Sequence, residues 1–264
     1  MRRILAICFS VLLVIGSLSL SGCGNNNTGN LSEKNTSGSS ESMTGNLTGK
    51  SAYDSPYHQL EKPAVGDEVA VIHTNMGDIT VRFFPEAAPK TVENFKGLVK
   101  KGALNNQSFY RVVNNFMIQG GNKSDLNSIW GGSFEDEFDP NLMNIRGALS
   151  MANSGANTNS SQFFIVQAGT SSFNGWEYYE KNKEGAVYDY DSWTDEQKKV
   201  YEENGGTPWL DGGHRKDGAG HTVFGQVISG MDVVDKIAAV PTNSKDMPIQ
   251  AITIQSVELI AYQG

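Results

Sequence analysis

The fold of this chain is decided by residues 109–122, which have the sequence FYRVVNNFMIQGGN. Two apolar runs, 109–113 and 116–118, flank an Asn-Asn pair, and the stretch ends in Gly-Gly. This pattern predicts two strands joined by a tight turn, then a loop that needs the backbone angles open to glycine. Two polar residues, Arg111 and Gln119, stand among the apolar ones and are the first candidates for a functional site.

Arg111 allows two interpretations from this stretch alone. An arginine is almost never fully buried without a partner, so it points either into a cleft or to solvent from the polar face of a strand. A second stretch, residues 147–165 with the sequence GALSMANSGANTNSSQFFI, favours the cleft. Its polar centre would normally form a surface turn, but it lies between two strand-like runs and ends in Gln-Phe-Phe.

Together, the two stretches resemble the cyclophilin family of peptidyl-prolyl cis-trans isomerases. The pattern Phe-x-Arg-Val-x-x-x-Phe-Met-Ile-Gln-Gly-Gly is followed in family order by Leu-Ser-Met-Ala-Asn and Asn-Thr-Asn-x-Ser-Gln-Phe-Phe. A third piece, Trp-Leu-Asp-Gly at 209–212 followed by His-Thr-Val-Phe-Gly at 221–225, also fits. The resemblance extends from about Val69 to the C-terminus. It implies a mainly β fold, a closed antiparallel eight-stranded barrel capped by two α-helices.

Hydrophobic periodicity predicts the elements around these motifs. Strands are expected at residues 68–74, 78–83, 222–228 and about 249–261. One helix begins at Pro89, where the missing N–H costs nothing, and ends at Gly102, with apolar residues at helical spacing between them. A second amphipathic helix begins at Met231. The alternation of the last strand shifts near Ser256, which predicts a β-bulge.

The resemblance also implies the site and its chemistry. A prolyl amide resists rotation by about 18–20 kcal/mol because its C–N bond has partial double-bond character. Arg111 would stabilise the twisted amide and not the planar one, since a guanidinium stays charged and holds its donors in a rigid fork. Gln119 would hydrogen-bond the substrate backbone, and the main chain of Asn153 would pair with the peptide like a strand. No nucleophile, metal or cofactor is expected.

Further substrate-binding residues follow from the family pattern. They would line or border a pocket for the proline ring: Phe116, Met117, Ala152, Gln162, Phe164, Trp209, Leu210 and His221. His221 has a rival in His214, because an extra segment separates the Trp-Leu-Asp-Gly piece from the histidine. Trp209 occupies the position that the family associates with cyclosporin, so we expect the drug to bind.

Three residues beside these groups depart from the family pattern. Tyr110 stands where the family often has His, and Ala156 and Ser160 replace a usual Pro and Gly. These differences bear on rate and loop shape. The acidic run at residues 135–137 could hold a cation or form a solvated loop, and the loop is favoured.

The composition of the 264-residue chain excludes one class of partner. Its net charge of −8 argues against a nucleic-acid partner, because phosphate binding needs a basic surface. Both cysteines, Cys8 and Cys23, lie near the N-terminus, so no disulfide is expected in the folded part. We expect a monomer that binds proline-containing polypeptides.

The N-terminus resembles that of a bacterial lipoprotein. Residues 1–22 combine two arginines with an apolar run and lead into Leu-Ser-Gly-Cys, which predicts a signal peptide cut before a lipidated Cys23. A permanent membrane helix is the alternative, but the run is short for one. Lipid on Cys23 would hold the protein on the outer face of the membrane. Residues 23–65, rich in Asn, Gly, Ser and Thr, are expected to be a flexible tether.

The expected isomerase domain covers residues 66–264 and carries an insertion at about 169–207. Before a helix that Thr194 is expected to cap, the insertion contains six Trp and Tyr residues: Trp176, Tyr178, Tyr179, Tyr188, Tyr190 and Trp193. Its aromatic side chains could form a lid, a second binding surface or a satellite cluster, and the cluster is favoured.

Three functions remain for the experiment to separate. The first is an extracytoplasmic isomerase that accelerates the folding of secreted proteins. The second is a chaperone-like module that holds proline-containing peptides without turnover. The third is an adhesin that uses the aromatic insertion. Arg111 favours the first, because binding alone would not require a cation over the prolyl nitrogen.

Overall fold

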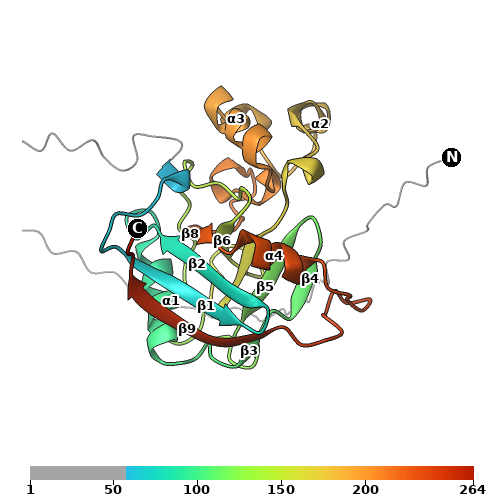
Figure 1. Ribbon diagram of the computed structural model, residues 1–264. Coiled ribbons are helices and arrows are strands. Elements are labelled where there is room, and N and C mark those ends of the chain that lie inside the picture. The colour runs from blue at the N-terminus through green and yellow to red at the C-terminus, as the bar shows by residue number, and fades with distance from the viewer. Residues whose placement is uncertain (1–57) are drawn as a thin grey trace, which may run out of the picture. The chain divides into compact units, whose positions relative to one another are not determined.

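The computed structural model describes residues 58–264, whose strands form one antiparallel sheet (Figure 1). The expected signal peptide, Cys23 and most of the tether lie outside the described residues. The sheet order is β3-β9-β1-β2-β8-β6-β7-β5-β4. Its strands are β1 (Glu68–Thr74), β2 (Gly77–Phe83), β3 (Gln107–Ser108), β4 (Arg111–Val113), β5 (Met117–Gly121), β6 (Ala148–Met151), β7 (Gln162–Val166), β8 (Val223–Ser229) and β9 (Thr253–Ala261).

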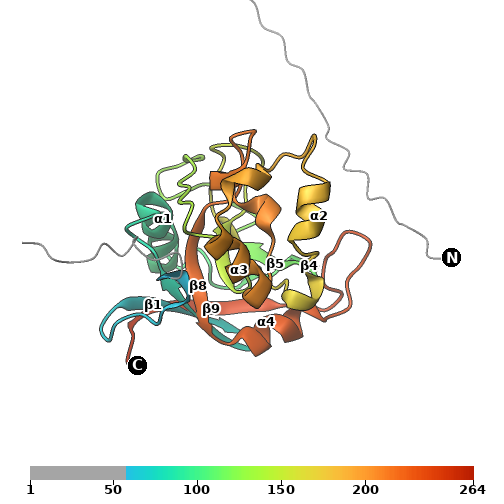
Figure 2. The ribbon, with the colours of Figure 1, turned by 90° about the horizontal axis from the view of Figure 1, so that it is seen from above.

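Four α-helices accompany the sheet in residues 58–264. They are α1 (Pro89–Lys100), α2 (Trp176–Lys181), α3 (Asp195–Asn204) and α4 (Met231–Ala238). The two expected helices, α1 and α4, lie well apart in both views, and both pack into one apolar core inside the curled sheet (Figure 2). Over the described residues, no helix combines the length and apolarity that a membrane span needs.

The strand and helix counts differ from the expected eight strands and two helices. Strands β3 and β4 stand at opposite ends of the sheet order, yet both belong to the single segment 107–113. Between them, Phe109 N donates to Ile252 O on the β9 side, and Tyr110 N donates to Gln119 O on the β5 side. One segment therefore serves both edges of the sheet, although no ladder joins β3 to β4 in the described part. The other two helices belong to the insertion: α3 is the helix that Thr194 was expected to cap, and α2 was not expected.

The apolar residues whose spacing predicted the helices and strands are the ones that form the core. Helix α1 has Pro89 in its first turn and buries Val92, Phe95 and Leu98. The ring of Phe95 lies 5.4 Å from that of Phe163 and 5.5 Å from that of Phe224, within the range of favourable aromatic pairs. The bulge predicted near Ser256 is confirmed by a register shift between β1 and β9 at that point.

Packing begins before residue 66, where the folded domain was expected to start. A short 3₁₀ turn, His58–Leu60, carries Gln59, whose side chain is buried. Its Nε2 donates to Met143 O at 2.8 Å and its Oε1 accepts from Met143 N at 2.8 Å. The last residues of the expected tether therefore belong to the folded unit.

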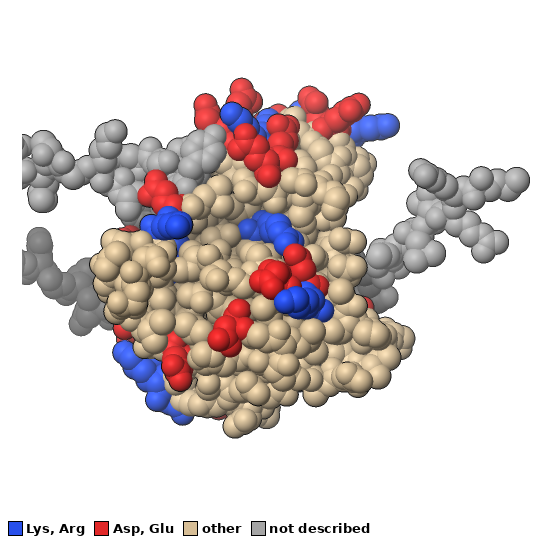
Figure 3. All heavy atoms as spheres, viewed as in Figure 1, with Lys and Arg blue, Asp and Glu red and all other residues tan. Residues whose placement is uncertain are grey.

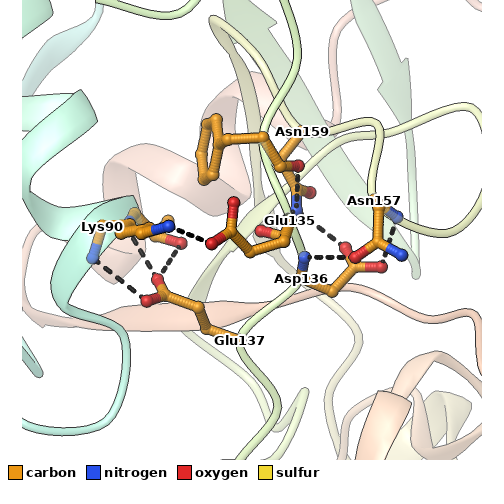
Figure 4. Close-up of polar contacts among 8 residues, drawn as sticks. Lys90, Glu135, Asp136, Glu137, Asn157 and Asn159 are labelled. Carbon is orange, nitrogen blue, oxygen red and sulfur yellow. Dashed lines mark hydrogen bonds and ion pairs between the residues drawn. The ribbon is translucent and has the colours of Figure 1, made fainter. Parts of the chain in front are cut away.

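The acidic run at 135–137 is not a simple solvated loop. The Glu137 carboxylate accepts hydrogen bonds from Lys90 N, at 3.1 Å, and from Thr91 N, at 2.8 Å (Figure 4). These N–H groups open α1, which has no capping side chain of its own. Glu137 therefore satisfies donors that a helix N-terminus leaves without partners, and its charge suits that end of the helix dipole.

The insertion forms the satellite cluster that was favoured. Trp176, Tyr179, Tyr188 and Trp193 are buried in it together with Tyr201 of α3. Thr194 caps α3 through a reciprocal capping box with Gln197, as the sequence predicted. Because most of these rings face inward, the cluster offers little aromatic surface to a partner. Its outer face is acidic (Figure 3), with exposed Glu177, Glu180, Asp195, Glu196, Glu202 and Glu203.

Candidate active site

A cavity of about 130 Å³ lies against β4, β5 and β7. Four separate segments build it: the β4–β5 hairpin, the end of β6, the middle of β7 and the loop before β8. Nine of the eleven expected site residues line this cavity: Arg111, Phe116, Met117, Gln119, Ala152, Asn153, Phe164, Leu210 and His221.

Strand register places the polar pair and the cavity floor in one row. Arg111 on β4 is directly opposite Gln119 on β5, and Gln119 is directly opposite Phe164 on β7. Directly opposed residues of antiparallel strands project from the same face of the sheet. The hairpin turn between β4 and β5 needs a left-handed residue, which Asn115 supplies with a φ of 61°. The Asn-Asn pair in the sequence thus sets the register that brings Arg111 to Gln119.

Arg111 keeps its guanidinium at the edge of the cavity. Its side chain is 41% exposed, and its Nε lies 3.4 Å from Asp246 Oδ2. Asp246 belongs to the loop after α4, and its carbonyl accepts from Val112 N at 2.8 Å along the outer edge of β4. An exposed ion pair of this length contributes about 0–1 kcal/mol to stability. The guanidinium of Arg111 therefore remains available to a ligand.

The Gln119 side chain is oriented by Tyr110. Its Nε2 donates to the Tyr110 hydroxyl at 2.8 Å. Burial raises the pKa of Tyr110 to about 12, so the hydroxyl stays protonated at neutral pH. With its amide nitrogen engaged in this way, Gln119 can present its oxygen to a peptide N–H in the cavity.

Removing the Tyr110 hydroxyl tests this orientation. We expect Tyr110→Phe to lower kcat/KM for a proline-containing peptide about two- to fivefold, because one neutral hydrogen bond that holds Gln119 is lost. Tyr178→Phe, the same change at a half-exposed tyrosine of α2, serves as the control and should leave kcat/KM unchanged. A Tyr110→Phe variant with wild-type kcat/KM would show that Gln119 needs no such support.

Apolar side chains form the floor and walls of the cavity. Met117 and Phe164 are 2% and 4% exposed, while Phe116 and Leu210 are half-buried. The His221 ring stands edge-on to Phe164, with centroids 5.2 Å apart. A small apolar floor with a cation and an amide at its edge suits a compact apolar ring joined to a peptide backbone.

His221, and not His214, reaches the cavity. Its Nδ1 lies 2.8 Å from Met151 O, which accepts a hydrogen bond from that nitrogen. Burial lowers the pKa of His221, so the ring is neutral at neutral pH. His214 is instead buried against the insertion, with Nδ1 2.8 Å from Ser192 Oγ and its ring stacked on Trp193.

Two expected site residues lie beside the cavity and do not line it. Gln162 pairs with Gly121 at the end of β7, and its carbonyl accepts from Ala152 N at 3.0 Å. Trp209 stacks on Phe116 from behind, with ring centroids 6.1 Å apart, and its other neighbour is Tyr179 of the insertion at 6.4 Å. The insertion therefore supports one wall of the cavity through Trp209.

The sequence did not identify Tyr110 or Asp246 as parts of the site. Tyr110 was noted only as a departure from the family pattern. Asp246 has no local pattern that points to Arg111, because the contact joins residues far apart in the chain. In the described residues, no group of three His, Cys, Asp or Glu side chains is arranged to hold a metal ion.

Comparisons with known proteins agree on one family. Residues 69–259 match the family described as cyclophilin type peptidyl-prolyl cis-trans isomerase/CLD. A Staphylococcus haemolyticus protein, named "Putative peptidyl-prolyl cis-trans isomerase", is 42% identical over 208 residues, which cover 77% of this chain and 97% of that protein. A Staphylococcus saprophyticus protein of the same name is 43% identical over 209 residues, covering 77% and 98%.

Solved structures show the same similarity. A cyclophilin type peptidyl-prolyl cis-trans isomerase of Cryptosporidium parvum is 27% identical, with a TM-score of 0.54, over 74% of this chain and 98% of that one. A structure of that protein in the presence of the dipeptide Ala-Pro is similar to the same degree, with a TM-score of 0.54 at 26% identity.

Proposed function

The chain belongs to the cyclophilin-type peptidyl-prolyl cis-trans isomerases, and from this premise we propose that it works outside the cytoplasmic membrane and accelerates the folding of secreted and surface proteins. The isomerase activity in this proposal is supported by one observation: Arg111, Gln119 and Phe164 lie in a row along one cavity. The guanidinium can face the prolyl nitrogen, the amide can bond to the peptide backbone, and the apolar floor can hold the proline ring.

In the proposed mechanism, the protein stabilises a twisted amide and forms no covalent bond. The proline ring occupies the floor over Met117 and Phe164, and the guanidinium of Arg111 faces the prolyl nitrogen. As the C–N bond twists, that nitrogen regains a lone pair and accepts a hydrogen bond that the planar amide cannot accept. Interactions that are stronger in the transition state than in the ground state raise kcat.

Gln119 and Asn153 hold the peptide in the proposed complex. The Gln119 oxygen accepts from a substrate N–H, and the main chain of Asn153 pairs with the substrate backbone. Support for substrates that contain proline also comes from the Cryptosporidium parvum relative, which was solved in the presence of Ala-Pro.

The proposed location rests on the sequence Leu20-Ser21-Gly22-Cys23 after an apolar run. Lipid on Cys23 would anchor the chain at the outer face of the membrane, and a tether of about 40 residues would span roughly 35 Å. Fractionation of cells that express the full chain tests this proposal. The wild type should sediment with membranes and be digested by protease added to intact cells, whereas Cys23→Ser should leave the lipid-anchored fraction. Because an uncleaved apolar run could also hold Cys23→Ser at the membrane, the deciding readout is the mass of the membrane-bound chains. A wild-type chain without lipid on Cys23 would refute lipid anchoring.

The folding role is tested with a protein whose refolding is limited by proline isomerisation. Residues 24–264 at catalytic amounts should accelerate the slow refolding phase in proportion to their concentration. A chaperone-like module without turnover would instead bind the unfolded chain and leave the rate unchanged or slower.

Cyclosporin binding is also proposed, on the position of Trp209 in the family pattern. Residues 24–264 should bind the drug with a dissociation constant below the high micromolar range, and Trp209→Ala should weaken binding. A dissociation constant that stays above that range would show that the insertion behind Trp209 excludes the drug.

A further inference from the structure

Asp136 ties two segments together beside the cavity (Figure 4). Its Oδ1 accepts from Asn159 Nδ2 at 2.7 Å, and its Oδ2 accepts from Asn157 N at 2.7 Å. Its own main-chain N donates to Asn157 Oδ1 at 3.0 Å. Three hydrogen bonds thus join this one residue to the loop between β6 and β7.

That loop includes Asn153, which lines the cavity. Asn153 Nδ2 donates to Gly220 O at 2.8 Å and lies 3.5 Å from Asp136 Oδ1. Residues 153–159 contain no strand, and their turn needs a left-handed residue, Asn157, with a φ of 58°. The loop has hydrogen bonds of its own, from Ser154 N to Thr158 Oγ1 at 2.9 Å and from Thr158 Oγ1 to Gly155 O at 2.7 Å. These bonds make the loop one unit, and its contacts with Asp136 fix where that unit lies.

We propose that Asp136 is a positioning residue for peptide binding, which holds the main chain of Asn153 in the geometry that pairs with substrate. This inference rests on the role proposed above for Asn153. Asp136 does not line the cavity and acts through Asn153, Asn157 and Asn159. Its carboxylate suits the task because both of its oxygens only accept, and both face N–H donors.

The two neighbouring acids contact other partners and provide a comparison within the same run. The Glu135 carboxylate pairs with Lys90 Nζ on α1, and both side chains are about half exposed. Glu137 holds the first turn of α1. Among the three carboxylates, the hydrogen bonds from the 153–159 loop go to Asp136.

The test compares Asp136→Asn with Glu135→Gln. Both variants remove one negative charge from the same run and keep the shape of the side chain. In Asp136→Asn one oxygen becomes an amide NH₂, which must face either Asn157 N–H or Asn159 NH₂, so one donor loses its acceptor. Peptide dissociation constants come from NMR titration of a proline-containing peptide, and the isomerisation rate at saturation comes from exchange NMR.

We expect Asp136→Asn to weaken peptide binding about five- to tenfold, which is within the range for the loss of one hydrogen bond of average strength. The rate at saturation should stay within about twofold, because Arg111 and Gln119 lie on other strands. Glu135→Gln should match the wild type in both quantities. Reversible partial unfolding would raise the apparent dissociation constant by the reciprocal of the folded fraction and keep the rate at saturation. The folded fraction of each variant is therefore measured without peptide, and its dissociation constant is corrected by that fraction.

A second variant covers the case in which Asp136→Asn does not fold. Asn157→Gly keeps the left-handed backbone and the bond from residue 157 N to Asp136 Oδ2, and removes only the acceptor of Asp136 N. It should weaken peptide binding about twofold.

Three outcomes would overturn the inference: wild-type affinity in Asp136→Asn, equal weakening in Glu135→Gln, or, where Asp136→Asn does not fold, wild-type affinity in Asn157→Gly. Failure of the proposed function looks different. In that case the wild-type protein itself would show no peptide-induced shift at the Asn153 amide, or no exchange.

Discussion

Arg111→Ala should lower the rate of prolyl isomerisation at saturating peptide by about 10²- to 10³-fold, the usual cost of removing a donor aimed at charge that develops in a transition state. The affinity for the peptide should change much less, because the cavity floor and Gln119 remain. Arg111 is 41% exposed and makes only a long ion pair with Asp246. Its removal should therefore leave the thermal midpoint almost unchanged. Exchange NMR on one peptide yields both the rate and the affinity.

Arg111→Lys separates charge from shape in the same experiment. Lysine keeps the positive charge but lacks the planar fork, so we expect its rate to lie between those of the wild type and Arg111→Ala. Lys100→Ala, at the end of α1, removes a positive charge away from the cavity and should have no effect. If Arg111→Ala retained most of its rate, the cavity would be a binding site and the twisted amide would be stabilised elsewhere.

Substitution of Asp211 should have a large effect on the free energy of unfolding, as substitution of Arg111 should have on the rate of isomerisation. Its side chain is buried and contacts Tyr201 of the insertion and Asn144, which lies outside the insertion. Oδ1 accepts from Asn144 N at 2.7 Å and from Asn144 Nδ2 at 2.9 Å, and Oδ2 accepts from Tyr201 OH at 2.5 Å. Asp211→Ala leaves three buried donors without an acceptor, each at a cost of about 1–3 kcal/mol. We expect a loss of at least about 3 kcal/mol in the free energy of unfolding, measured in urea.

The same carboxylate predicts a specific dependence of stability on pH. Burial raises the pKa of Asp211 from 3.8 to about 6, against the lowering effect of its hydrogen bonds. A raised pKa means that the folded state binds the proton more tightly than the unfolded state. The contribution of this group to stability is therefore full below about pH 4 and is lost as the pH rises through about 6.

Asp211→Asn isolates that contribution, because Asn cannot ionise and the other titrating groups are common to both proteins. The free energy of unfolding of the wild type relative to Asp211→Asn should fall by up to about 3 kcal/mol between pH 4 and pH 7.5. A difference that stays constant with pH, or that grows as the pH rises, would show that Asp211 keeps an ordinary or lowered pKa in the folded protein.

Asp211 also links the insertion to the cavity wall. Tyr201 lies on α3, Leu210 lines the cavity next to Asp211, and Leu210 O accepts from His221 N at 3.0 Å. Together with the stack of Tyr179 on Trp209, this network gives the insertion two contacts with the wall of the cavity.

The sequence by itself determined most of the elements and their buried faces, although it did not predict β3 or α2. The buried face of α1, the bulge near Ser256, the cap at Thr194 and the β4–β5 hairpin follow from periodicity and turn chemistry, which act over a few residues. Motif order was enough to name the nine residues that line the cavity, and to prefer His221 to His214.

Only the tertiary structure decided which distant side chains support that site. Gln59 meets Met143, Asp136 meets the Asn157 loop, Asp211 meets Asn144 and Tyr201, and Asp246 meets Arg111. It also decided that segment 107–113 is shared by two edges of the sheet and that Trp209 lies behind Phe116. The physical reason is that these contacts join residues whose separation along the chain leaves no local pattern. A polar side chain looks the same in a sequence whether its partner is water or a buried donor, and only the folded chain brings that donor to it.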